Sequence, residues 1–145
     1  MNCSSLESVD LTSLQGLRVQ ELTNMFKGCT KLTTIVGLDG IDASNVTYCD
    51  YMFYNCQAIE NINLSTFTLN NANVTSMFQS CYKLSSLTLS DNFNFDASKS
   101  NFMFRDTGHD VDGDCTIFGV TDSGIKTKLS TALKNNGNTK MKIAD

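Results

Sequence analysis

The chain has 145 residues, the length of one domain or of one part of a longer array of repeats. Hydrophobic residues make up 41% of it, which is enough for a continuous core. The net charge of −4 argues against a nucleic-acid partner, since phosphate binding needs a cationic face. No apolar run approaches the roughly 18 residues of a membrane span, and the first ten residues lack the basic-then-apolar plan of a signal peptide.

Two motifs recur with the same period of 25 to 27 residues. Cysteine does so at positions 3, 29, 56 and 81, and a Met-Phe pair begins at positions 25, 52, 77 and 103. Self-similarity at a fixed period is the signature of repeat architectures. We therefore divide residues 1–109 into about four repeat units, the first of them partial.

The first half of each unit carries apolar residues at helical spacing. Val74, Met77, Phe78 and Cys81 stand at i, i+3, i+4 and i+7, and the segments 22–29 and 49–56 follow the same pattern. One apolar stripe at this spacing predicts a short α-helix of about two turns.

The second half of each unit predicts a short strand with one buried face. Leu87 and Leu89 alternate with polar residues, as do Ile62 and Leu64 one unit earlier. A unit this small cannot bury its apolar stripe alone, so we expect the units to stack, with Met on Met and Phe on Phe. The strands of successive units would then pair in parallel, and the fold class is an α/β solenoid.

The repeat resembles the units of the BspA-like leucine-rich-repeat surface proteins. The shared residues include "ASNVT" at 43–47, "MF" at 52–53, Cys56, Ile59 and Ile62, with a second match from Asn73 to Ser90. The resemblance implies a leucine-rich-repeat right-handed superhelix of short parallel strands and short helices. It also implies a secreted or cell-surface protein of a bacterium or protist, often concerned with adhesion. Two departures are an extra residue in "TTIVGLDG" and Thr107 where cysteine is expected.

Residues 110–145 differ in composition and are expected to form a C-terminal cap. "DSGIKTKLSTALKNNG" places apolar residues at helical spacing after Asp122 or Ser123 as the N-cap, with Gly137 ending the helix. "KMKIAD" predicts a final short strand. Five lysines outnumber two aspartates across 122–145, which fits either a surface for anionic partners or, as we favour, the solvated face of a capping helix.

The cysteines are expected to be small buried hydrophobes, because spacings near 26 residues are repeat spacings and no close pair suggests zinc. Stacked cysteines would point the same way into the core, which is poor disulfide geometry. The assignment covers Cys3, Cys29, Cys49, Cys56 and Cys81, and leaves Cys115 open.

The loop "HDVDGDC" supplies the weak candidate for a metal site. Asp110, Asp112 and Asp114 offer oxygen ligands for calcium, but the register is wrong for an EF-hand, and a turn explains the same residues. His109 is the sole histidine, and the glycines have neither P-loop nor dinucleotide-binding spacing. We therefore expect no enzyme and no cofactor.

The residues that flank the buried strand positions are expected to form an exposed, polar binding face. They are small and lack the large side chains that dominate interfaces. The members are Ser8, Asp10, Thr34, Asn61, Asn63, Ser86 and Thr88.

Two functions remain open from the sequence. The first is a non-catalytic module of an adhesin-like protein that binds a host protein or glycan at this face, gaining affinity by repetition. Tyrosines 48, 51, 54 and 82 offer a second contact surface on the opposite side. The alternative is a structural spacer without a ligand. No cap is visible before the first strand, so this N-terminal edge is a candidate for self-association.

Overall fold

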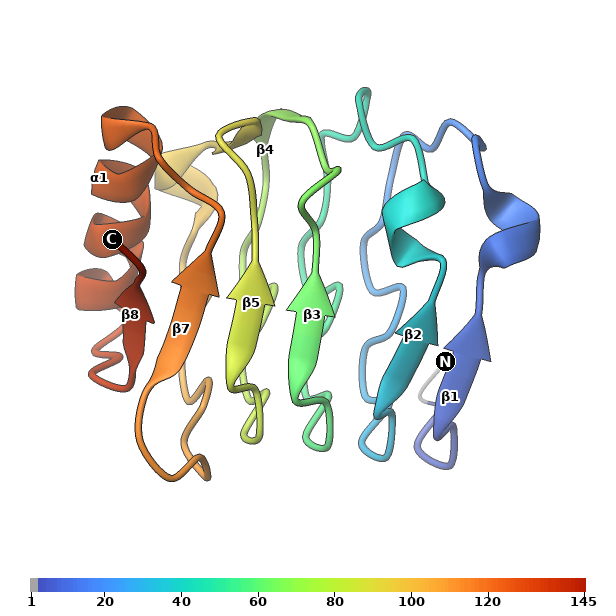
Figure 1. Cartoon of the computed structure of the whole chain (residues 1–145), viewed down its shortest axis with the longest axis horizontal. Helices are drawn as coiled ribbons and strands as arrows, with labels where there is room; N and C mark the ends of the chain where they lie inside the picture. Colours follow the sequence, from blue (N-terminus) through green and yellow to red (C-terminus); the bar gives the residue numbers. More distant parts are fainter. Residues whose placement is uncertain (1–2) are drawn as a thin grey trace.

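The computed structural model describes residues 3–145, and within them the chain is a mixed α/β structure with parallel strands and one α-helix. Six strands lie side by side in one layer, with the helix at the far end of the row (Figure 1). These strands are β1 (Ser8–Asp10), β2 (Thr34–Val36), β3 (Asn61–Asn63), β5 (Ser86–Thr88), β7 (Cys115–Phe118) and β8 (Met141–Ile143).

The predicted strands are confirmed, because β1, β2, β3 and β5 each fall in the second half of one repeat unit. The paired strands run parallel, and their register places Ile62 beside Leu87 and Leu87 beside Ile117. These three central side chains are buried. Their neighbours in the strand consequently point to the opposite face, as the two-residue period of a strand requires.

A second, two-stranded sheet lies behind this layer. It consists of β4 (Leu69–Ala72) and β6 (Phe93–Phe95), which pair in parallel and bury Leu69, Ala72, Phe93 and Phe95. The sequence pattern did not indicate these strands. Three short 3₁₀ turns complete the connections, and they span Thr12–Leu14, Leu38–Gly40 and Ala97–Lys99.

The prediction of short α-helices in the first half of each unit is wrong. The segments 22–29, 49–56 and 74–81 are runs of turns, and the one α-helix within residues 3–145 is α1 (Ser123–Asn135). Alternate amides bond differently: Met25 N–H donates to Leu22 O within the unit at 3.2 Å, whereas Phe26 N–H donates to Met52 O in the next unit at 2.9 Å. An α-helix keeps its bonds within one segment, so this division between units excludes it.

Residues with a left-handed backbone conformation also recur at fixed positions within these turns. Every fourth residue has positive φ, first Asn24 and Gly28, then Tyr51 and Asn55 in the following unit. Four amides of each of the segments 22–29, 49–56 and 74–81 donate to carbonyls of the unit that follows, and the direction is the same at all three junctions. The apolar spacing of i, i+3, i+4 and i+7 therefore arises from two consecutive turns that bury the same side.

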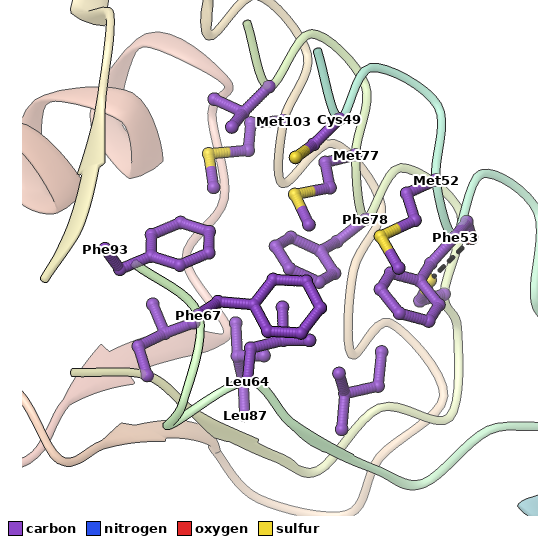
Figure 2. Close-up of a cluster of buried hydrophobic side chains, with 14 of the residues drawn as sticks. Cys49, Met52, Phe53, Leu64, Phe67, Met77, Phe78, Leu87, Phe93 and Met103 are labelled. Atoms are coloured by element: carbon purple, nitrogen blue, oxygen red, sulfur yellow. Dashed lines mark hydrogen bonds between the residues drawn. The ribbon is translucent and has the colours of Figure 1, made fainter. Parts of the chain in front are cut away.

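The core contains the predicted ladder of phenylalanine rings, which is confirmed. Phe26 stacks on Phe53 with ring centroids 5.5 Å apart, and Phe53 on Phe78 and Phe78 on Phe104 at 5.7 Å. Figure 2 shows Met52 and Met77 alongside Phe53 and Phe78, with Leu64 and Leu87 nearby in the same core. The methionine ladder is shorter than expected, because the Met25 side chain is 36% exposed.

The repeating cysteine has a specific partner. The thiol of Cys56 donates to the carbonyl of Phe26 one unit earlier at 3.1 Å, and Cys81 does the same to Phe53 O. Thr107 takes this place in the next unit, and its hydroxyl donates to Phe78 O at 2.8 Å. The residue that departs from the motif thus keeps the hydrogen bond.

Five of the six cysteines are buried and all six are free thiols. Burial raises the pKa of the Cys56 and Cys49 thiols to about 12. The prediction that Cys3 is buried is wrong, because it lies at the end of the stack and is exposed. Cys115, left open by the sequence, is buried in β7.

The strands do not form the single continuous sheet that regular stacking predicts. β1 and β2 form one sheet, β3, β5, β7 and β8 form another, and no backbone ladder joins β2 to β3 within residues 3–145. The extra residue noted in "TTIVGLDG" lies at this place, where Gly37 adopts a left-handed conformation with φ of 77°. The irregularity thus directly follows β2, the strand whose pairing with β3 is missing.

The C-terminal segment continues the stack before ending it. Strand β7 pairs with β5 as another repeat strand would, and β8 pairs with β7. Helix α1 begins as predicted, with the Asp122 carboxylate accepting from Ile125 N–H at 2.8 Å. Gly137 follows it with φ of 65°. The predicted helix and final strand are therefore confirmed.

Two asparagines reproduce the contacts of a further unit. The amide of Phe104, which would reach the carbonyl of the next unit, donates to Asn136 Oδ1 at 3.0 Å. The Phe104 carbonyl, which would accept from the next cysteine, accepts instead from Asn138 Nδ2 at 2.6 Å. The Asn136 side chain thereby pairs an amide that would otherwise lack a partner, and Asn138 adds a second donor to a carbonyl that also accepts from Thr107 N–H at 3.2 Å.

Candidate functional site

The outer face of the strand layer carries all seven residues of the predicted binding face. Register places Ser8 beside Thr34, Asn61 beside Ser86 and Asn63 beside Thr88. Ser86 and Thr88 are half-buried and the others are exposed. Paired positions on neighbouring strands lie about 5 Å apart, so the structure brings these side chains together in two rows.

Part of this face is fixed by hydrogen bonds at the ends of the strands. Asp10 Oδ1 accepts from Thr12 N–H at 2.8 Å, and Asn63 Oδ1 accepts from Ser65 N–H at 3.0 Å. The hydrogen bonds from the Thr12 backbone and hydroxyl lower the pKa of Asp10 from its ordinary value. Both side chains are therefore held in one orientation while their other polar atoms remain free to bind.

Two exposed apolar residues on this face were missed. Val36 pairs with Asp10 and is 47% exposed, and Phe118 pairs with Thr88 and is 43% exposed. The sequence did carry a signal, because "IV" and "IF" each place two apolar residues in succession in a strand whose faces alternate. An exposed aromatic residue among small polar ones is a typical centre of an interface.

A groove of about 150 Å³ divides the face where β2 and β3 fail to pair. Asn61 and Asn63 lie on one side of it, so the structure separates them from Thr34 on the other sheet. The lining residues are Ile35, Leu38, Asp39, Asn61, Ile62 and Asn63.

The tyrosines gather on the turns rather than on helices. The rings of Tyr51 and Tyr54 meet edge to face with centroids 5.8 Å apart. Lys27 Nζ lies 4.6 Å from the centre of the Tyr51 ring and 5.5 Å from that of Tyr54. Tyr48 is 52% exposed, and Tyr82 lies beside His109. This cluster is a second candidate contact surface.

The structure does not bring the three aspartates of the candidate metal loop together. Asp110 contacts His109, with Oδ1 and Nδ1 2.7 Å apart, whereas Asp114 forms an ion pair with Lys142 at 2.6 Å. Among residues 3–145, no group of three His, Cys, Asp or Glu side chains is placed to hold a metal ion. A hydrogen bond with His109 holds Asp110, and an ion pair with Lys142 holds Asp114.

Comparison with known proteins identifies one family. The family described as "Mycoplasma protein of unknown function, DUF285" matches residues 1–113. No curated protein and no solved structure matches the chain. No helix within residues 3–145 has the length and apolar character needed to cross a membrane.

Proposed function

Because the chain belongs to the family described as Mycoplasma protein of unknown function, DUF285, we propose a function from its surface. It is a non-catalytic interaction module of a secreted or cell-surface, adhesin-like protein, and the outer face of the strand layer binds a host protein or glycan. The cell-surface assignment rests on the resemblance to the BspA-like proteins. The match to residues 1–113 covers the whole of the repeat region 1–109.

We propose further that the repeats are leucine-rich repeats wound into a right-handed solenoid. The support is the period of 25 to 27 residues, the single strand that each unit adds to the parallel layer, and the stacked rings at centroid distances of 5.5 to 5.7 Å. An architecture of this kind presents the same positions of every unit on one surface.

The observation that carries the binding function is the registered pair of side-chain rows on the outer face. Hydroxyl and carboxamide groups repeat at strand spacing, and Val36 and Phe118 add exposed apolar area among them. Each small polar group contributes little alone, whereas several that bind one extended ligand act together. This favours a ligand that is itself repetitive or extended.

A structural spacer is the second candidate. Its support is the stacked core, in which six phenylalanines are fully buried and the main-chain bonds repeat from unit to unit. Such a stack is stiff along its length because every unit is bonded to its neighbours. A spacer needs no particular chemistry on its outer face.

An array of glycans and host proteins separates the two candidates. A reproducible ligand that is lost with Asn63→Arg plus Thr88→Arg supports binding at the outer face, because these paired positions would carry two bulky cations. Asn135→Arg is the matched control, since Asn135 is exposed on α1 away from this face. Loss of the ligand only when Tyr51 and Tyr54 are changed would move the site to the tyrosine cluster. An array without any ligand would favour the spacer.

A separate proposal concerns the outer edge of β1. Within the described residues β1 pairs with β2 alone, so its other edge presents free main-chain groups that a second copy of the chain can pair with. Leu17, 52% exposed, adds apolar surface at the same end of the stack. Sedimentation velocity tests it: a concentration-dependent dimer supports the proposal, and a monomer at all concentrations refutes it.

A further inference from the structure

We propose that the groove between β2 and β3 is a subsite for one sugar ring, and that it is where the outer face recognises a glycan. This inference rests on the proposed binding function and deepens it, since it selects the ligand class and the place. Three properties of the groove carry the proposal: unpaired main-chain groups, a polar rim over an aliphatic floor, and a size that excludes a peptide strand.

The first property is the missing main-chain ladder. At the equivalent junctions the residue after one strand donates to the last residue of the next, as Leu11 N–H does to Val36 O at 2.8 Å and Leu64 N–H to Thr88 O at 2.8 Å. The same register directs the amide after β2 to the carbonyl of Asn63, and no such bond forms. Main-chain donors and acceptors along the groove are therefore left for a ligand or for water.

The second property is the chemistry of the side chains. Asp39 supplies a carboxylate that accepts hydrogen bonds, and the carboxamides of Asn61 and Asn63 both donate and accept. Half-buried Ile35 supplies aliphatic surface between them, and the buried side chains of Leu38 and Ile62 lie beneath it. Hydroxyl groups of a sugar also donate and accept, while its ring presents C–H surface, so a sugar matches both parts of the groove.

The third property is size. A peptide strand inserted between β2 and β3 would need them two strand spacings apart, roughly 9.6 Å. Figure 1 shows β2 and β3 farther apart than the neighbouring strands, but the turns behind the groove leave no such space, because Phe26 and Phe53 stack with centroids 5.5 Å apart. The groove has a volume of about 150 Å³, below the roughly 300 Å³ at which pockets for drug-sized ligands begin. A single ring with its hydroxyls suits this space better than a strand.

The groove is also a fixed feature of the backbone. Gly37, at the inserted position, packs so closely on the preceding unit that an added Cβ would lie 2.8 Å from the amide nitrogen of Thr12. Its left-handed φ of 77° is strained for other residues. The local shape that separates β2 from β3 is thus held by contact with the first unit, and a ligand would meet a preformed site.

The test is a titration of the ¹⁵N-labelled chain with methyl glycosides of glucose, galactose, mannose and N-acetylglucosamine, followed by amide chemical shifts. Sugar concentrations up to about 10 mM cover a Kd of about 1 mM. We expect at least one glycoside to shift the amides of Ile35, Asn61 and Asn63. Asn61→Ala and Asp39→Asn should each weaken that binding about tenfold, the effect of one lost ligand hydrogen bond. Asn135→Ala, at an exposed position of α1 outside the binding face, should leave it unchanged.

The unliganded spectra of the variants establish that each has kept its fold. The inference is overturned if no glycoside shifts a groove amide, or if the shifts persist in Asn61→Ala and Asp39→Asn. If the array experiment still finds a ligand that Asn63→Arg plus Thr88→Arg abolishes, the binding function stands and the sugar groove alone fails. If the array finds no ligand while a glycoside binds the groove, the extended binding face fails and the groove stands.

Discussion

The side chain of Asn138 is the most informative position at which to perturb the C-terminal cap. Its Nδ2 donates to Phe104 O at 2.6 Å and Thr107 O at 3.0 Å, and its Oδ1 accepts from the amides of Lys140 and Met141, each at 2.9 Å. Each such bond stabilises the fold by about 0.5–1.5 kcal/mol net. For a half-buried side chain with four bonds, we expect Asn138→Ala to lower the free energy of unfolding by about 2–4 kcal/mol.

Asn138→Asp provides a sharper version of the same test. It keeps the oxygen that accepts from Lys140 and Met141 but turns a second oxygen toward the carbonyls of Phe104 and Thr107. We expect it to destabilise the chain more than alanine does. Urea unfolding followed by circular dichroism measures both, with Asn135→Ala, an exposed position, as a control that should change stability by less than about 0.5 kcal/mol. The conclusion that Asn138 replaces contacts of a further repeat unit would be refuted by an Asn138→Ala variant as stable as this control. An Asn138→Asp variant more stable than Asn138→Ala would also refute it.

Three further outcomes are expected. In the native chain near pH 8, a thiol reagent should modify Cys3 quickly and the buried cysteines only after unfolding. The reason is that Cys3 is exposed, whereas burial raises the pKa of the Cys56 thiol, for example, to about 12. Rapid reaction of more than one thiol would contradict the burial of the other five cysteines. Hydrogen exchange should be faster at the amide of Asn61 than at that of Ser86, which donates to Glu60 O at 3.1 Å; equal protection would mean that β2 and β3 do pair. Hydrogen bonds from the Asp122 amide and from Thr121 hold the pKa of Asp91 below its ordinary 3.8. The stability that its carboxylate contributes is therefore present above pH 3.8 and lost as the pH falls below it. Asp91→Asn should lower the urea midpoint at pH 7 and make little difference near pH 2, whereas an equal loss at both pH values would exclude the charge as its cause.

The repeat and the packing of its core were predictable from spacing alone. The recurring Met-Phe and cysteine positions identified which side chains meet across units, and the stacking of Phe53 on Phe78 follows from them. The local conformation was not predictable from the same residues, because two successive turns place apolar side chains at the same intervals as a helix. A signal was present at Asn24, Gly28 and Asn55, whose types tolerate left-handed φ, but Tyr51 at an equivalent position obscures it.

The candidate site was predictable in outline and not in detail. Alternation within the strands placed Asn61, Asn63 and Thr88 on the outer face, as the register confirms. The groove was not predictable, since the extra residue at Gly37 indicates an irregularity without saying which junction it opens. The role of Asn138 was hidden as well, because "NNGNTK" has the composition of an ordinary loop, and only the folded chain brings it to Phe104.

In the segments 22–29, 49–56 and 74–81 the amides that bond between units all donate to the following unit, which gives the stack of turns a direction. At each junction the earlier turn supplies N–H groups and the later turn supplies carbonyls, as with Phe53 N–H and Met77 O. The N-terminal end of such a stack therefore exposes carbonyl groups without donors, and the C-terminal end exposes N–H groups without acceptors. Asn136 and Asn138 pair with main-chain groups at the C-terminal end, and the same contacts could not serve the main-chain groups at the N-terminal end. Anyone who lengthens, shortens or fuses these units must therefore preserve their polarity.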